Sequence, residues 1–400
     1  MIFAAIADDF TGGTDLAGML SESGARTVLA FGAAEVPPGY DASVSCLKSR
    51  SVKPKDAVSM TLDALVGARA HAPRQIYFKY CSTFDSTPEG NIGPVCDALL
   101  RELGAESTLA IPALPVNGRT QYMGHLFVHG VPLAETSMRN HPLNPMTDSN
   151  LVRWLQRQTK RKVGLLPLRG ENLPRGVEIA LADVIGDDDL DFLAARFADA
   201  PLLTGGSGMG TSLPKVWRAR GWMRNDETQL AEAPGGAALI LAGSCSAATL
   251  SQLERLGGDQ VSIDAAALLE DVEKETGRVL REARKQLRAV GHAVIRSSQT
   301  AEEREASGLD GQIVAEELEM LFGVIASTLS DEVKRLIVAG GETAGAVTAA
   351  LGVEAAEVGR VIDPGVPAIR PVGDGPALTL VLKSGNFGSA DFFRKALEGT

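Results

Sequence analysis

The sequence predicts an α/β protein built from two α/β domains, each with a mostly parallel sheet, and an active-site cleft between them. Short apolar segments that resemble strands alternate with helical patterns along the whole chain. The chain has 400 residues, which is long for one domain and comfortable for two. The alternation stops once, at the polar and then Pro/Gly-rich stretch MRNDETQLAEAPGG (223–236), and then starts again.

The first domain is expected to span residues 1–224. Its clearest helical patterns lie at 55–70 and 93–103. Residues 113–150 break the alternation because they are rich in Pro, Asn, Gly and His, and we expect an irregular excursion with a hairpin there. The strands expected in this domain are 2–7, 27–31, 43–47, 75–81, 108–111, 163–166 and 202–204.

A linker is expected at 225–236 and a second domain at 237–400. Long helices are predicted at 272–290 and 311–330. Ligand sites are common in clefts between domains, which is why the active site is expected in that cleft. The strands expected in the second domain are 238–242, 260–263, 293–297, 335–339, 359–362 and 378–383.

Composition and charge exclude several classes of protein. The formal net charge of −11 argues against nucleic acid as a partner, because a phosphate backbone needs a basic face. No apolar run approaches the ~18 residues of a membrane span, so no membrane partner is expected. The N-terminal segment lacks the basic flank of a signal peptide, and the four cysteines form no CxxC pair, so we expect a reduced, cytoplasmic setting.

Polar side chains follow four predicted strands of the first domain, where ligands of open α/β sheets bind. The acids could accept a proton from a hydroxyl, bind a metal ion or hydrogen-bond a polyol, and the bases could hold a carboxylate or a phosphate. The candidates are Asp8, Asp9, Asp15, Arg50, Lys79, Asp85, Asn117 and Arg119.

The first of these strand ends reads IADDFTGG, with two adjacent carboxylates before a pair of glycines. Since successive strand residues point to opposite sides, we expect Asp8 and Asp9 to face different partners. We expect Gly12 and Gly13 to let the chain turn sharply, so that Asp15 joins the same pocket.

Three strand ends of the second domain are instead rich in Gly, Ser and Thr. Glycine lets the backbone approach an anion, and a helix N-terminus presents free N–H groups, so these turns predict a phosphate-rich ligand such as a nucleotide. No Walker or dinucleotide-binding motif is present, so the site must be of another type. The candidates are Ser244, Gly340, Gly341, Glu342, Thr343, Lys383, Gly385 and Asn386.

Together these motifs resemble the four-carbon acid sugar kinases over essentially the whole chain. The family's substrate domain is similar to the segments ADDFTGGTD, KSRS, YFKYCSTFDSTPEGNIG and the long segment from PVNGRTQ to NHPLNPMTDSNL. Its nucleotide-binding domain is similar to GGSG, AGSCS, GGETAGAV, DPGVPA and LKSGNFGSADFF. The long segment is most similar to the members that phosphorylate 3-oxo-tetronate.

The resemblance implies an ATP-dependent kinase of carbohydrate metabolism that converts 3-oxo-tetronate (3-dehydro-tetronate) to its 4-phosphate, with Mg²⁺ bridging the phosphates of ATP. Our mechanistic hypothesis is that one of the aspartates accepts the proton of the 4-hydroxyl, with Asp9 and Asp85 as the leading candidates. The resemblance also implies ATP contacts at Ser244, at Gly340 to Thr343 and at Gly385, and an acid-sugar site lined by Asp8, Asp9, Asp15, Arg50, Lys79 and Asp85.

Other readings remain open on the sequence alone. A related four-carbon acid such as threonate or erythronate is one alternative substrate. A metal-dependent phosphatase or lyase with Asp8 and Asp9 as metal ligands is another class, and a non-catalytic sugar-acid sensor is a third. The sequence leaves open the D or L preference, the identity of the base, the metal ligands and the oligomeric state, for which a symmetric homodimer is the commonest arrangement.

Overall fold

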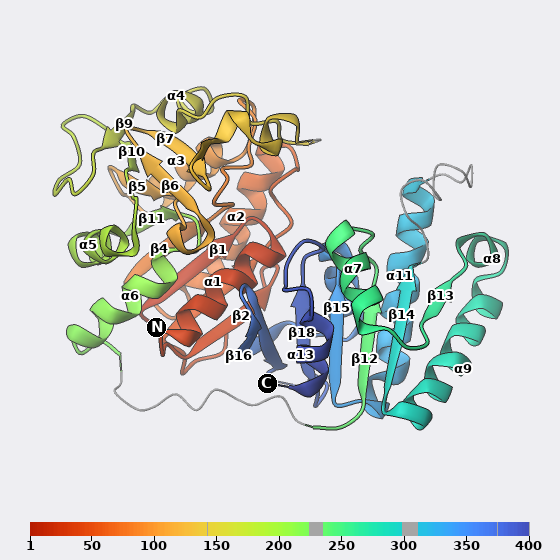
Figure 1. The fold of residues 1–400 in the computed structure, drawn as a ribbon. Coiled ribbons are helices and arrows are strands. Elements are labelled where there is room, and N and C mark those ends of the chain that lie inside the picture. The colour runs from red at the N-terminus through yellow and green to blue at the C-terminus, as the bar shows by residue number, and fades with distance from the viewer. Residues whose placement is uncertain (142, 224–234, 298–310, 374, 400) are drawn as a thin grey trace. The chain divides into compact units, whose positions relative to one another are not determined.

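The computed structural model describes residues 1–141, 143–223, 235–297, 311–373 and 375–399 (Figure 1). The chain divides into two compact units, Met1–Gln229 and Leu230–Thr400. Each unit is a sheet flanked by helices, which confirms the predicted class of two α/β domains with mostly parallel sheets. Most of the predicted linker, 225–234, lies outside the described residues.

The sheet of the first unit runs in the order β2-β3-β1-β4-β11-β5-β10-β9, and every neighbouring pair is parallel. The carboxyl ends of these strands therefore lie at one edge of the sheet. Every residue of β1 is buried, as expected for a strand covered on both faces. The strands are β1 (Phe3–Ala7), β2 (Thr27–Phe31), β3 (Ala42–Cys46), β4 (Gln75–Lys79), β5 (Thr108–Ile111), β9 (Val163–Leu166), β10 (Ile179–Ala182) and β11 (Leu202–Gly205).

The helices of the first unit include α1 (Phe10–Glu22), α2 (Pro54–Arg69), α3 (Ile92–Glu102), α4 (Leu151–Leu155), α5 (Asp187–Phe197) and α6 (Met209–Ala219). Helices α2 and α3 pack together over the apolar side chains of β1 and β4, among them Ile6 and Phe78. Helix α1 packs against α6, and α5 against α6.

The expected excursion at 113–150 contains a small antiparallel sheet of β6 (Arg119–Tyr122), β7 (His125–Val128) and β8 (Val131–Pro132). The β6–β7 turn is fixed by Asp183, whose carboxylate accepts the N–H groups of Met123 at 2.7 Å and Gly124 at 2.9 Å. Short 3₁₀ turns complete the segment: η1 (Pro115–Asn117), η2 (Leu133–Glu135) and η3 (Ser137–Asn140).

The sheet of the second unit runs β13-β14-β12-β15-β18-β17-β16. The first five strands in this order are parallel, whereas β17 is antiparallel to both of its neighbours. No strand was expected over β17, where two prolines in VPAIRP weaken the strand pattern. The strands are β12 (Ala238–Ala242), β13 (Val261–Ile263), β14 (His292–Ser297), β15 (Arg335–Ala339), β16 (Ala355–Asp363), β17 (Val366–Pro371) and β18 (Thr379–Lys383).

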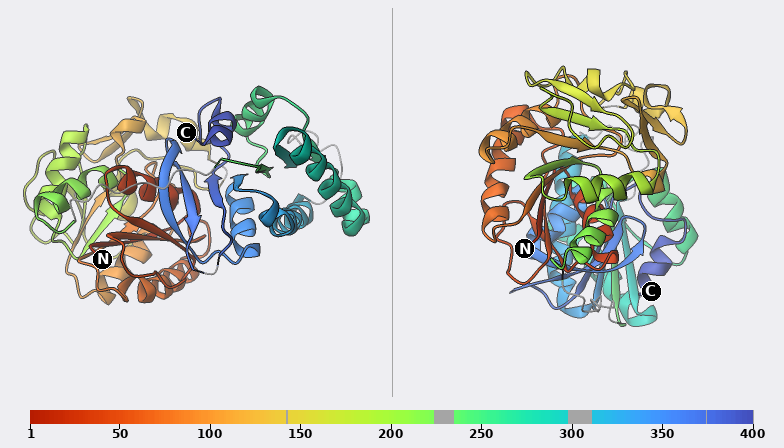
Figure 2. Two further views of the ribbon diagram at one scale, coloured as in Figure 1. Left: turned by 90° about the horizontal axis from the view of Figure 1, so that it is seen from below. Right: turned by 90° about the vertical axis from the view of Figure 1, so that its left-hand side faces the viewer.

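Helices cover both faces of this second sheet (Figure 2). Helices α7 (Ala247–Leu256) and α13 (Phe392–Glu398) contact each other and share one apolar cluster with the strands. The remaining helices are α8 (Ala265–Glu270), α9 (Val272–Val290), α11 (Gly311–Leu329) and α12 (Gly341–Ala350), with a 3₁₀ turn, η4 (Ser330–Glu332). Among the described residues, no helix has the length and apolar character needed to cross a membrane.

Candidate active site

The opening motif places two carboxylates at the junction of β1 and α1. Asp8 continues the line of β1, and its N–H donates to the carbonyl of Lys79 at 2.9 Å. Asp9 is the N-cap of α1, and its carboxylate accepts the N–H of Gly12 at 3.0 Å and the hydroxyl of Thr11 at 2.7 Å. An aspartate is favoured at an N-cap because its carboxylate accepts hydrogen bonds from the free N–H groups of the helix's first turn.

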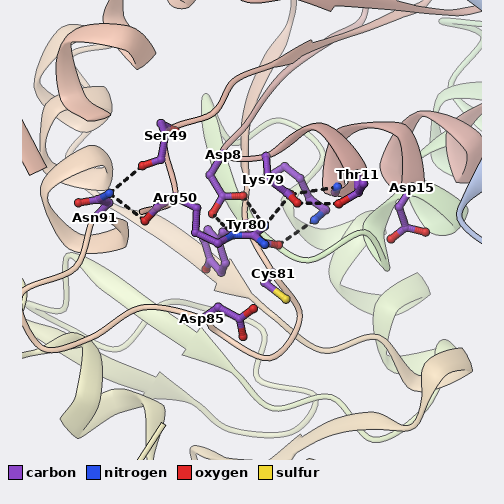
Figure 3. A network of polar contacts seen from close by, with 12 residues as sticks. Asp8, Thr11, Asp15, Ser49, Arg50, Lys79, Tyr80, Cys81, Asp85 and Asn91 are labelled. Carbon is purple, nitrogen blue, oxygen red and sulfur yellow. Dashed lines mark hydrogen bonds and ion pairs between the residues drawn. The ribbon is translucent and has the colours of Figure 1, made fainter. Parts of the chain in front are cut away.

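Arg50 joins the two carboxylates (Figure 3). Its Nε and Nη2 donate to the two oxygens of Asp8 at 3.0 and 2.7 Å, and Nη2 also donates to Asp9 at 2.6 Å. The expectation that Asp8 and Asp9 face different partners is therefore met only in part, because both bind Arg50 while only Asp9 also accepts the backbone N–H of Gly12. Asp9 already belongs to the helix cap, so the alternation of the strand stops at Asp8.

Asn91 holds the backbone that carries Arg50. Its Nδ2 donates to the carbonyls of Ser49 at 2.7 Å and Arg50 at 3.0 Å (Figure 3). It also donates to the carbonyl of Val52 at 2.9 Å. Asn91 lies just before α3, on a segment remote in sequence from Arg50. No spacing in the sequence links the two residues, which is why this supporting role was not predicted.

Lys79 ends β4 with only 2% of its surface exposed, and its ammonium donates to the carbonyl of Tyr80 at 2.9 Å. A Cβ added at Gly12 would lie 2.8 Å from that ammonium and would overlap the carboxylate of Asp9. Gly12 is therefore the residue that lets an acid and a base approach the same point of α1.

The two glycines of the motif do not form the sharp turn that was expected. Both lie in the first turn of α1 with ordinary helical backbone angles. A Cβ at Gly13 would overlap the sulfur of Cys46 and lie 3.2 Å from the Cβ of Ala7. Close packing of α1 on β1 and β3, rather than a turn, explains them.

The environments of Asp8 and Asp9 drive their pKa values in opposite directions. Burial raises the pKa of Asp8, and its pairing with Arg50 only partly offsets this. Burial also acts to raise the pKa of Asp9, but Arg50, Lys79 and the hydrogen bonds from Thr11 and Gly12 outweigh it and hold that pKa below its usual value. The Asp9 side chain is 25% exposed against 7% for Asp8, so Asp9 is the carboxylate that a ligand can reach more easily.

Asp15 lies one helical turn beyond Gly12 and is buried. It accepts a short hydrogen bond from the hydroxyl of Ser207. Burial raises its pKa, while Lys79, Ser207 and Arg119 act to lower it. Lys79 acts to lower the pKa values of both Asp9 and Asp15, and whether the three share one ligand pocket stays a prediction.

Ser207 belongs to the GGSG segment at 205–208, which begins at the last residue of β11 and leads into α6. This segment was expected to resemble the nucleotide-binding domain, but the structure places it in the first unit. Gly205 has a φ of 152°, and a Cβ there would overlap the carbonyl of Ile111. These glycines let β11 and β5 approach closely while Ser207 reaches Asp15.

The remaining candidates of the first unit lie at the margin of this cluster. Arg119 donates from Nη1 to the carbonyl of Asn117 at 2.6 Å, whereas its buried Nε has no partner in the described part of the chain. Asn117 thus contributes its backbone. Asp85 accepts the hydroxyl of Thr83 at 2.6 Å and lies beyond Cys81, apart from the Arg50 contacts (Figure 3).

In the second unit, the three Gly-rich turns follow β12, β15 and β18, which are adjacent in the sheet. The N–H of Ser244 donates to the carbonyl of Ala339 at 3.0 Å, and that of Gly340 donates to the carbonyl of Lys383 at 2.9 Å. A Cβ at Gly385 would overlap the hydroxyl of Ser244. The structure therefore brings the candidates of all three turns together.

Lys383 holds the turn that follows β18. Its side chain is 1% exposed, and its ammonium donates to Thr249 Oγ1 at 2.9 Å and to the carbonyls of Ser384 and Gly385 at 3.0 and 3.1 Å. Burial lowers the pKa of Lys383 to about 8. The three donors of the ammonium are all engaged within the protein, so this lysine organises the turn.

Other side chains bind the carbonyls of the same turn. Gly385 also receives the hydroxyls of Ser246 at 2.6 Å and Thr249 at 2.9 Å. Gln252, which sequence reasoning missed, donates to the three consecutive carbonyls of Phe387, Gly388 and Ser389. Only the fold brings these residues of α7 against this turn.

The bound carbonyls orient the N–H groups of the turn. In a trans peptide the N–H points opposite to the preceding carbonyl, so the N–H groups of Gly385 and Asn386 point away from Lys383. Neither N–H has a protein acceptor among the residues that the structure describes. The turn therefore presents its donors to an anion.

The middle turn begins α12. Gly340 has a φ of 131° and is the N-cap of that helix, while Thr343 is buried against Gly243. Glu342 and Asn386 are exposed. No group of three or more His, Cys, Asp or Glu side chains able to hold a metal ion is found in the described ranges.

The comparisons with known proteins agree with this division. Residues 3–213 match the family model of a sugar-binding N-terminal domain, and residues 239–393 match that of a nucleotide-binding C-terminal domain. Two proteins named 3-oxo-tetronate kinase are similar to the chain. That of Pseudomonas fluorescens is 46% identical over 99% of this chain and 96% of its own, and that of Pseudomonas savastanoi is 45% identical over 99% and 97%.

The fold is also similar to a crystal structure from Salmonella typhimurium LT2, provisionally described as a tRNA synthase. The two share 37% identity with a TM-score of 0.88, over 98% of each chain. With both domain models matched and such relatives aligned along nearly its whole length, the chain belongs to the four-carbon acid sugar kinase family.

Proposed function

We propose that the protein is an ATP-dependent kinase that phosphorylates the 4-hydroxyl of 3-oxo-tetronate, giving the 4-phosphate and ADP. The observation that carries this proposal is that a chain of this family has two different candidate sites, one in each unit. One unit holds a buried cluster of acids and bases, and the other presents backbone N–H groups at the turn after β18 and at the start of α12. The names of relatives at 45–46% identity support the choice of substrate.

Arg119 is the best candidate for the clamp on the substrate carboxylate. Arg50 had also been a candidate, but its Nε and Nη2 already make three hydrogen bonds to Asp8 and Asp9. Arg119 instead keeps a buried Nε without a partner among the described residues, and a carboxylate ligand would satisfy it.

Asp9 is the proposed base that accepts the proton of the 4-hydroxyl as the oxygen attacks the γ-phosphate. Its lowered pKa keeps it ionised at neutral pH, and it is more exposed than Asp8. In phosphoryl transfer the base mainly orients the hydroxyl, so strong basicity is not required. Lys79 would stabilise negative charge that develops beside Asp9, and Asp85 is the alternative base.

The phosphates of ATP are proposed to bind the N–H groups of the Gly340 and Gly385 turns. Kinases use Mg²⁺. Most ligands of this ion are oxygens of phosphates and water, so it needs only one or two protein carboxylates. Glu342, exposed in the first turn of α12 beside Gly340, is the carboxylate proposed to hold the ion. A bound Mg²⁺ would neutralise phosphate charge during transfer.

The test is ADP release measured with a panel of four-carbon acids: both enantiomers of 3-oxo-tetronate, threonate and erythronate. We expect ADP formation that depends on an acid and is fastest with a 3-oxo-tetronate. Faster turnover of threonate or erythronate would move the substrate assignment within the family. Release of phosphate from the 4-phosphate without nucleotide would support the phosphatase alternative, and binding of the acid without turnover would support a sensor.

A further inference from the structure

The motif DPGVPA (363–368) forms a turn of the second unit, and the turn explains only part of it. It joins β16 to β17 in an antiparallel hairpin in which Asp363 pairs with Val366. Gly365 has a φ of 77°, the left-handed conformation that favours glycine in such a turn. The hairpin does not need an acid at Asp363, yet this side chain is only 4% exposed. Its buried carboxylate therefore requires another explanation.

The carboxylate of Asp363 binds the far end of the turn that follows β18. Its Oδ2 accepts the N–H and the hydroxyl of Ser389, both at 2.6 Å. Its Oδ1 accepts the ammonium of Lys395, on α13, at 3.0 Å. Burial acts to raise the pKa of Asp363, but the hydrogen bonds from Ser389 and Lys395 outweigh it and hold that pKa below its usual value. Asp363 is therefore an ionised acceptor at neutral pH.

Asp363 and Lys383 hold opposite ends of this turn. Lys383 binds two carbonyls at its start, and Asp363 binds the N–H of Ser389 at its end. The N–H groups of Gly385 and Asn386, which have no protein acceptor among the described residues, lie between the two ends. Because hydrogen bonds to a charged group are strong, the carboxylate limits how far the end of the turn can move.

We propose that Asp363 is a positioning residue for this turn: through the N–H of Ser389, it keeps the N–H groups of Gly385 and Asn386 directed at the phosphates of the nucleotide. The proposal rests on the proposed kinase function and adds to it a residue that acts without touching the ligand. The Asp363 carboxylate is buried and is already occupied by Ser389 and Lys395. Its ion pair with Lys395 holds α13 instead.

Substitutions can separate the two sets of bonds that Asp363 makes. Asp363→Ala removes both of them. Lys395→Met removes only the ion pair with α13. Asp363→Asn keeps an oxygen that can accept the Ser389 N–H, but it has no charge. Asp331→Ala is the matched control, because Asp331 is an exposed acid of η4 in the same unit.

The probes are a non-hydrolysable ATP analogue and inorganic tripolyphosphate, titrated by calorimetry. We expect Asp363→Ala to weaken both about 10-fold, since an N–H of the turn loses its acceptor, and Asp363→Asn to weaken both about 3-fold. Lys395→Met should lower the midpoint of denaturant unfolding, since it leaves a buried charge unpaired, yet bind both probes within about 2-fold of the wild type. Asp331→Ala should match the wild type in affinity and in stability.

Three results would overturn the assignment. One is wild-type affinity for both probes in Asp363→Ala, or in Asp363→Asn where the alanine variant does not fold. Another is a Lys395→Met protein that loses as much affinity as Asp363→Ala, which would place the effect in α13. The third is a wild type that binds neither probe. A wild type that binds both probes but forms no ADP with any acid would refute the kinase proposal alone, and the titrations would still test Asp363.

Discussion

The two units bind their proposed ligands by opposite means. The first unit uses charged side chains: Asp8, Asp9, Arg50 and Lys79 gather at neighbouring strand ends, and the two bases act on the pKa values of the two aspartates. The second unit uses its backbone, and its charged Lys383 is turned inward to hold a loop. A sugar acid must be oriented and deprotonated at one hydroxyl, which needs side chains with tuned pKa values, whereas a polyphosphate needs only N–H donors and shape.

The largest expected effect is on turnover in the first unit. Asp9→Asn should lower kcat by ~10²–10⁴ and leave the affinity for an ATP analogue unchanged, because the proposed base is lost while the nucleotide turns are intact. Steady-state kinetics and calorimetry measure the two quantities. Asp63→Asn, on the exposed face of α2, is the matched control.

The same assay on Asp85→Asn decides between the two candidate bases. If Asp9→Asn keeps near-normal kcat and Asp85→Asn does not, the base is Asp85. If Asp9→Asn lowered the affinity for the ATP analogue as much as it lowered kcat, the two units would not bind their ligands independently.

A second prediction concerns stability. Arg50→Met leaves two carboxylates without their partner, and the free energy of unfolding should fall by ~3–5 kcal/mol in a denaturant titration. Arg69→Met, at the exposed end of α2, should change little. Adding Asp8→Asn to Arg50→Met should recover part of the loss, since it removes one unpaired charge. No recovery would mean that packing, and not charge, is what Arg50 supplies.

A third prediction addresses the backbone site. Lys383→Met removes the two hydrogen bonds to the Ser384 and Gly385 carbonyls and a third to Thr249 Oγ1, and KM for ATP should rise ~10-fold with KM for the sugar acid unchanged. Lys334→Met, an exposed lysine of the same unit, is the control. A fall in kcat without a change in KM for ATP would show that Lys383 acts on the transferred group rather than on the turn.

The smallest expected effect is on pH dependence. Burial lowers the pKa of Lys383 to about 8, well below that of an unfolded lysine. Above pH 8 the folded state releases this proton before the unfolded state does, so wild-type stability relative to Lys383→Met should rise between pH 8 and about pH 10. Denaturant unfolding of both proteins across this range measures the difference, and a constant difference would mean that the lysine stays charged throughout.

Sequence reasoning located the first site well where strand ends decide it. Asp8, Arg50 and Lys79 were found because β1, β3 and β4 are adjacent parallel strands whose ends meet. Their partners were not found. Asn91 binds the backbone of Arg50 from a segment that is distant in sequence. GGSG was assigned to the wrong domain because glycine-rich turns in a sugar-binding and in a nucleotide-binding domain have similar sequences.

The role of Gly12 shows a further limit. A glycine pair after two aspartates suggests a turn, yet Gly12 lies inside a helix. A glycine is needed there because Asp9 and Lys79 occupy the space that a side chain would take. Gln252 is similar, since its three bonds depend on α7 lying against the turn after β18. Such roles arise only from packing and leave no mark in spacing.

The turn after β18 is held before any ligand arrives, because Lys383, Ser246, Thr249 and Gln252 already fix its carbonyls. Little ordering is then left for the nucleotide to induce, and the site is preorganised. Such a site does not distinguish the origin of an anion. Sulfate or pyrophosphate in a buffer should therefore compete with ATP, so the choice of salt will affect the apparent affinity of the enzyme for its nucleotide.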